Sequence, residues 1–243
     1  MDRMTRSGGI PYLEAVQDDA AQVLRMRVAE EVSQRLAENG LRLSIHHQIG
    51  GAVAGVGFAT LTEMAAELAE GAARLYRAKL WYAGAALVRQ LLECGYLLAL
   101  AGDNPEEAEA WFAASPTEVR TRFMPKHTRP RATKTFRDSE YYSHCDHGGH
   151  PNPAARTLLR GHDYLSPVPA ESQWADLALH MAETWEAFCA ALPHYDPRLI
   201  PGDDLYSPDR APDGRTEIAQ LLDEWRSVDA LSSRIPPPQG ATA

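Results

Sequence analysis

Apolar side chains recur with helical spacing along almost the whole of this 243-residue chain, and no stretch shows the apolar–polar alternation of a strand. The clearest case is residues 172–192, where one apolar stripe contains Trp174, Leu177, Ala178, Met181, Trp185, Phe188 and Leu192. Helices of this kind must bury such stripes against one another. The sequence therefore predicts an all-α protein built as a helical bundle.

The same periodicity predicts helices over residues 12–39, 58–78, 81–101 and 216–231. Gly40 is expected to stop the first of them, with a Gly-rich connection over 41–57. Proline after Asn104 and after Ser115 predicts two short capped helices. A further helix is expected to run from Thr133 into a histidine-rich segment, until glycines and a proline end it at 148–151.

These segments divide the chain into five parts. A flexible N-terminus (1–10) precedes the bundle (11–195), and a Pro- and Asp-rich linker (196–215) leads to a C-terminal helix (216–232). The last eleven residues, 233–243, have the composition of a disordered tail.

Composition narrows the setting in which the protein works. A net charge of −9 argues against a general nucleic-acid coat protein but leaves room for a local anion site. Three widely spaced cysteines predict a reducing compartment, and no signal peptide is visible. The apolar stretch 80–101 carries Arg89 and Glu93 near its middle, which favours a buried helix over a membrane span. We expect a cytoplasmic protein without membrane contact.

Two adjoining segments concentrate the residues that can do chemistry. Residues 119–137 hold seven basic side chains and no acidic one: Arg120, Arg122, Lys126, Arg129, Arg131, Lys134 and Arg137. The next segment reads FRDSEYYSHCDHGGHPNP over 136–153 and contains His144, Cys145, His147 and His150. If 136–147 is helical, one face carries Arg137, Glu140, Tyr141, His144 and His147.

A polar stripe marks the third long helix. Its narrow sector contains Tyr82, Arg89, Glu93, Tyr96 and Leu100. Arg89 and Glu93 are four residues apart and can form an ion pair. One interpretation is a buried clamp that fixes helix register. The other is one wall of a site for an anionic ligand, in which Glu93 orients Arg89.

The histidine segment allows three interpretations. His144, His147 and His150 could hold a divalent metal ion. Alternatively, an arginine and a histidine on one helix face could carry out metal-free phosphodiester chemistry, while Arg129 and Arg131 hold phosphates. In the third interpretation these histidines only cap and fill a helix end.

Three further polar residues are expected to have no role in a site. Asp176, His180 and Glu183 look like a ligand set, but they lie opposite the apolar stripe of 172–192. We therefore expect their side chains to be solvated. Cys94 and Cys189 are expected to be small buried groups within helices.

The pattern resembles the HEPN superfamily of helical prokaryotic proteins, and an uncharacterised bacterial branch in particular. The resemblance rests on LVRQLLECGYLLAL (87–100) and EYYSHCDHGGHP (140–151), and it covers about 78–155. In HEPN nucleases an arginine precedes a histidine by five to seven positions, as Arg137 precedes His144. The resemblance implies that His144 is the general acid or base for attack by a ribose 2′-OH. It implies that Arg137 stabilises the transition state, often across a dimer interface.

The leading prediction is thus a metal-independent ribonuclease or RNA-binding effector of toxin or defence type, a homo-oligomer without cofactor. Its catalytic candidates are Arg137, His144 and His147, and its ligand-binding candidates are Arg89, Glu93, Tyr96, Tyr141, Arg129 and Arg131. RNA or another anionic ligand, and an antitoxin or other partner protein, are the expected partners. The alternatives are a metalloprotein using His144, His147 and His150, or a non-catalytic scaffold that binds a partner through 216–231.

Overall fold

The computed structural model describes residues 12–132, 136, 141, 144, 145, 150–159, 171–196 and 214–232. Helices make up most of these residues, and none of them is in a strand. The prediction of an all-α bundle is therefore confirmed.

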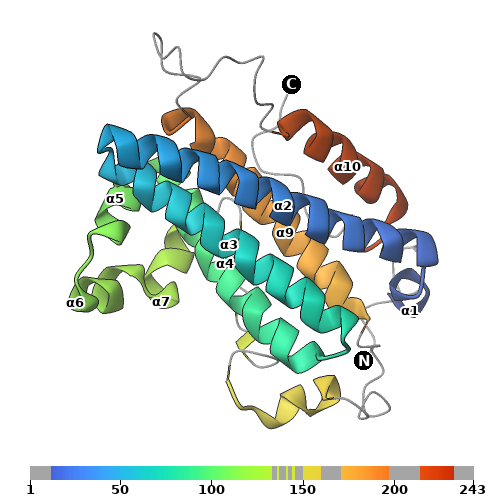
Figure 1. The fold of residues 1–243 in the computed structure, drawn as a ribbon. Coiled ribbons are helices and arrows are strands. Elements are labelled where there is room, and N and C mark those ends of the chain that lie inside the picture. Colours follow the sequence, from blue (N-terminus) through green and yellow to red (C-terminus); the bar gives the residue numbers. More distant parts are fainter. Residues whose placement is uncertain are drawn as a thin grey trace.

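Four long helices form the bundle (Figure 1). They are α2 (Asp19–Gly50), α3 (Val53–Arg77), α4 (Trp81–Asp103) and α9 (Ser172–Ala191). Each contacts the next, and α9 also packs against α2 and α3. Helices α4 and α9 run in the same direction, so the chain needs a long crossover between them. That crossover includes the basic stretch and the histidine segment.

Helix α2 departs most from the sequence prediction. A short helix α1 (Tyr12–Val16) comes first, and Asp18 then caps α2 by accepting a hydrogen bond from the Ala21 amide at 2.9 Å. The predicted stop at Gly40 and the connection over 41–57 are wrong, because α2 continues to Gly50. It ends at Gly51, whose φ of 69° is the left-handed conformation that glycine favours.

Gly40 serves close packing rather than helix termination. A Cβ atom at this position would come within 2.6 Å of Glu63 Cγ on α3. Gly55 of α3 is similar, since a Cβ there would overlap the His47 ring of α2. Glycine at a helix crossing lets two backbones approach closely, and sequence alone does not separate this use from a helix stop.

The crossover begins with short helical pieces whose caps agree with prediction. Helix α5 (Glu106–Phe112) starts where the Asn104 side chain accepts from the Glu106 amide. Helix α6 (Pro116–Glu118) starts with a capping box between Ser115 and Glu118. There follow a π-helical turn (Val119–Phe123), α7 (Pro125–Thr128), a 3₁₀ turn (Arg129–Arg131) and another 3₁₀ helix, η4 (Pro153–Leu158).

The C-terminal helix α10 (Arg215–Val228) lies along α2 (Figure 1). Its apolar face is buried there, through Ile218, Leu221, Leu222 and Trp225. The scaffold hypothesis assigned this face to a partner protein, but in the structure the face packs within the chain. The expected flexible N-terminus, most of the linker and the tail lie outside the described residues.

A buried ion pair joins α10 to the bundle. Arg25 of α2 and Asp229, just after α10, are both fully buried, with two N–O contacts of 2.7 Å. The remaining guanidinium N–H groups of Arg25 meet acceptors on Ala15, Val16 and Gln22. All five of its donors are thereby satisfied.

Helix α4 is long and apolar enough to cross a membrane, but 56% of its apolar window is buried inside the bundle. Burial of this extent is typical of a core helix. Cytoplasmic location stays a prediction. The three cysteines form no disulfide.

Candidate functional site

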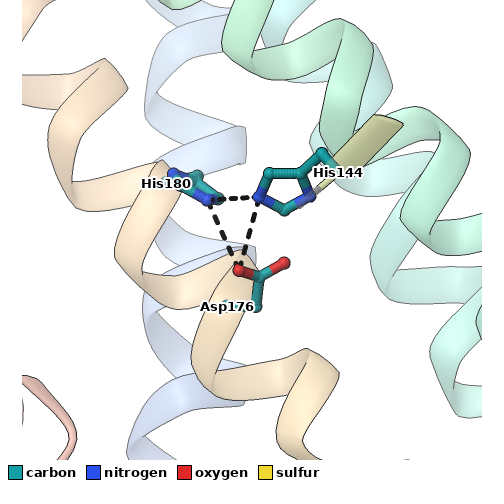
Figure 2. A group of neighbouring side chains, drawn as sticks. All are labelled: His144, Asp176 and His180. Carbon is teal, nitrogen blue, oxygen red and sulfur yellow. Dashed lines mark hydrogen bonds and ion pairs between the residues drawn. The ribbon is translucent and has the colours of Figure 1, made fainter. Parts of the chain in front are cut away.

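Three side chains converge at the point where the histidine segment meets α9 (Figure 2). His144 Nε2 lies 2.8 Å from His180 Nε2. Asp176 Oδ1 lies 3.5 Å from the first nitrogen and 3.4 Å from the second. His144, Asp176 and His180, called the buried triad below, thus place two nitrogens and one oxygen around a single point.

Helix α9 supplies two of the three residues. Asp176 and His180 are four positions apart and therefore lie on one face of the helix. His144 reaches that face from a helical position of the crossover. The His180 side chain is fully buried and that of His144 is 8% exposed, whereas Asp176 is 29% exposed. Asp176 is therefore the member of the triad with the most contact with solvent.

A fourth side chain determines how His180 presents its ring. Glu183 Oε2 lies 2.8 Å from His180 Nδ1, and this carboxylate is 4% exposed. A carboxylate accepts, so Nδ1 carries the proton that it donates to Glu183. The neutral His180 ring therefore directs an Nε2 lone pair toward His144 and Asp176.

The electrostatics of the triad favour a positive charge. Burial lowers the pKa of His180, but hydrogen bonds and the negative charges of Asp176 and Glu183 outweigh burial and raise it to about 10. In the metal-free protein His180 therefore holds a second proton at neutral pH. The site thus attracts a cation, for which protons and metal ions compete.

The spacing of the three donor atoms fits a metal ion. A circle through the two Nε2 atoms and the carboxylate oxygen has a radius of about 1.9 Å, close to the ~2.0–2.2 Å of zinc–nitrogen and zinc–oxygen bonds. One ion can therefore contact all three atoms without rearrangement of the helices. Among the described residues, His144, Asp176 and His180 are the histidine, cysteine or acidic side chains whose donor atoms lie close enough together to share one metal ion.

The expectation that His180 and Glu183 are solvated is wrong. Helix α9 is covered by α2, α3 and α4 and by His144, so it is buried on more than its apolar stripe. The usable signal in the sequence was the spacing of Asp176, His180 and Glu183 along one helix face. This spacing alone does not identify a site, because His144 is remote in sequence and contacts this helix face only in the folded protein.

Of the two other predicted metal ligands, only His150 lies among the described residues. His150 is exposed and outside the triad, and it acts electrostatically on Glu93 of α4, where it opposes the rise in the pKa of that carboxyl. His147 lies outside the described residues, as does Arg137. Among the described residues, His144 is thus combined with Asp176 and His180 of α9 and not with His150.

The polar stripe of α4 also faces the histidine segment, but through Tyr141. Arg89 donates to the Tyr141 hydroxyl at 3.2 Å and pairs with Glu93 at 2.9 Å. Arg129 lies over the Tyr141 ring, 5.1 Å from its centroid. Burial raises the pKa of Glu93 in spite of the neighbouring Arg89. These four side chains form a second polar cluster beside the triad.

Two other predicted ligand-binding residues have partners within the protein. Tyr96 is fully buried, with its ring against Phe136 in the core. Arg131 pairs with Glu107 of α5, which also binds Arg122 at 3.0 Å. Burial would raise the pKa of Glu107, but these two arginines outweigh it and lower the pKa. An acidic residue from outside the basic stretch thus neutralises part of that stretch.

Fold and site together define an all-α bundle with a buried cluster of two histidines and one aspartate. Comparisons with models of protein families, with curated proteins and with solved structures gave no match. The resemblance to HEPN proteins therefore stays a prediction, and the proposals below depend on the site alone.

Proposed function

We propose that this protein is a mononuclear metalloprotein whose ion is bound by His144, Asp176 and His180. The observation that carries the proposal is the convergence of three donor atoms within 3.5 Å of one another. The donor set indicates the class of metal. Imidazole nitrogens suit zinc, iron, cobalt and nickel, whereas magnesium and calcium prefer sites made only of oxygen.

The three ligands that the described residues supply leave at least one coordination position open. Structural zinc sites usually have four protein ligands, while catalytic sites have three and a water molecule. We expect water to reach that position through Asp176, the most exposed of the three ligands. A bound divalent ion lowers the pKa of such a water and makes it a nucleophile near neutral pH. Water activation at the ion is therefore the chemistry that we assign to the site.

Metal titration tests the proposal directly. Protein stripped with EDTA should bind one Zn²⁺ or Co²⁺ per chain, measured by elemental analysis after dialysis and by the visible absorption of Co²⁺. His180→Ala removes a ligand and leaves Glu183 without its partner. We expect it to lower the affinity at least 100-fold, because a two-ligand site binds weakly.

His194→Ala is the matched control, since His194 follows the same helix but is exposed and remote from the triad. It should bind one ion with wild-type affinity. Absence of stoichiometric binding by the stripped wild-type protein, or equal binding by His180→Ala, would rule out the proposal.

The metal-independent ribonuclease stays a prediction, because Arg137 and His147 lie outside the described residues. His144, its proposed acid or base, is buried and faces His180 and Asp176. The same preparations separate the two functions. RNA cleavage that persists in EDTA and disappears in His144→Ala would support the ribonuclease.

A further inference from the structure

Glu183 occupies a position that the triad alone does not explain. Its carboxylate is almost completely buried and accepts from His180 Nδ1, whereas the other ring nitrogen, Nε2, faces the triad. A buried carboxylate is costly unless its charge is compensated. Its burial beside a ligand histidine therefore requires a specific compensating charge.

The buried charges add up in favour of a divalent ion. With both imidazoles neutral, Asp176 and Glu183 give the four-residue group a formal charge of −2. One ion of charge +2 makes the group neutral, whereas a single proton leaves a net negative charge. A low-dielectric environment strengthens this preference, because an uncompensated charge costs more there than in water.

We propose that Glu183 is a positioning residue that holds the His180 ring for a divalent ion and supplies the second negative charge that balances it. The inference rests on the proposed metal function and adds a residue and an ion charge to it. Carboxylates that accept from the distal nitrogen of a ligand histidine fix its tautomer and make it a stronger ligand.

Two substitutions separate the charge of Glu183 from its hydrogen bond. Glu183→Gln keeps the size and an oxygen that can accept from Nδ1 but removes the charge. Glu183→Ala removes both. We expect the affinity for Zn²⁺ to fall about 10- to 100-fold in Glu183→Gln and further in Glu183→Ala, with one ion still bound at saturation.

Glu186→Gln provides the matched control. Glu186 lies three residues further along α9, but it is partly exposed and pairs with Arg226 of α10. This change also removes one carboxylate and one ion pair from the helix. It should leave Zn²⁺ affinity and the visible spectrum of the Co²⁺ protein unchanged, whereas Glu183→Gln should shift that spectrum.

The results separate failure of the proposed metal function from failure of the proposed role of Glu183. If the wild-type protein binds no ion, the proposed function fails and the role of Glu183 fails with it. If the wild type binds one ion and Glu183→Gln binds it within about threefold, with the same Co²⁺ spectrum, only the role of Glu183 is overturned. Glu183→Gln is nearly isosteric, and circular dichroism of the metal-free variant checks that it folds.

Discussion

Two buried polar regions of this molecule differ in how their hydrogen-bonding groups are matched. At Arg25 and Asp229, each N–H of the guanidinium ends on an oxygen, and Trp225 Nε1 donates to the same carboxylate at 2.8 Å. In the buried triad, two imidazole nitrogens and a carboxylate oxygen point at one another. In the first region the described contacts satisfy every donor of Arg25, while the second brings together three atoms that can each bind a cation.

From this difference in hydrogen bonding we propose a structural role for the first region and a metal-binding role for the second. Both regions contain fully buried side chains, and both join segments that are distant in sequence. Donors and acceptors balance at Arg25, so that pair positions helices α1, α2 and α10. At the triad, a metal ion or a proton can bind between the two imidazole nitrogens and the carboxylate oxygen.

The largest expected effect comes from a substitution that breaks the ion pair between Arg25 and Asp229. Asp229→Ala leaves the Arg25 guanidinium buried without a counter-charge, so it should lower the free energy of unfolding by about 3–5 kcal/mol. Urea denaturation measures this change. Asp223→Ala, which removes an exposed carboxylate from α10, should change stability by less than about 0.5 kcal/mol.

A double variant tests whether the Asp229 effect comes from the unpaired charge. Arg25→Met with Asp229→Leu replaces both partners by apolar groups, and it should be more stable than Asp229→Ala alone. A double variant as unstable as Asp229→Ala would indicate that lost packing, rather than the unpaired guanidinium, is the cause.

A smaller effect is expected when a metal ion is added to the buried triad. Zn²⁺ at 100 times its dissociation constant should stabilise the folded protein by about 2.7 kcal/mol. For a chain of this size, that corresponds to a rise in Tm of about 5–11 °C. Asp176→Asn should lose most of this rise, while Asp229→Ala should keep it because it shares no partner with the triad. An equal rise in all three proteins would mean that the metal binds elsewhere.

The smallest expected effect is on the pH dependence of stability. It comes from His47, a buried histidine whose pKa shifts in the direction opposite to that of His180. Burial lowers the pKa of His47, whose Nε2 lies 2.7 Å from the Tyr195 carbonyl, whereas carboxylates raise the pKa of His180. A lowered pKa means that the unfolded chain binds the proton more readily. Stability from His47 is therefore present above its unfolded pKa of about 6.5 and is lost as pH falls through its lower folded pKa.

His47→Gln should accordingly flatten the loss of stability between pH 7.5 and 5.5, by up to about 1 kcal/mol, in urea denaturation at each pH. Identical slopes for the two proteins would contradict the assignment. An NMR titration of His47 in the folded wild type gives the same answer without a substitution.

Sequence reasoning predicted the fold better than the site. Helical periodicity was enough to predict the bundle, because the apolar residues that a helix buries recur at every third or fourth position of the sequence. It misjudged Gly40, because a glycine that permits close packing looks the same as a helix stop. It also placed Asp176, His180 and Glu183 in solvent, because a stripe on one face of a helix does not tell how many neighbours cover the others.

By itself, the sequence determined the all-α class, the caps at Asn104 and Ser115 and the choice of His144 as a candidate, all of which depend on residues close together in the chain. The tertiary structure decided which partners His144 has. A parallel pair of helices, α4 and α9, forces a crossover that brings residue 144 against residues 176 and 180. The three donor atoms lie within a few ångströms of one another, although His144 is more than thirty residues from the other two side chains. The spacing of residues along the chain does not predict such a contact.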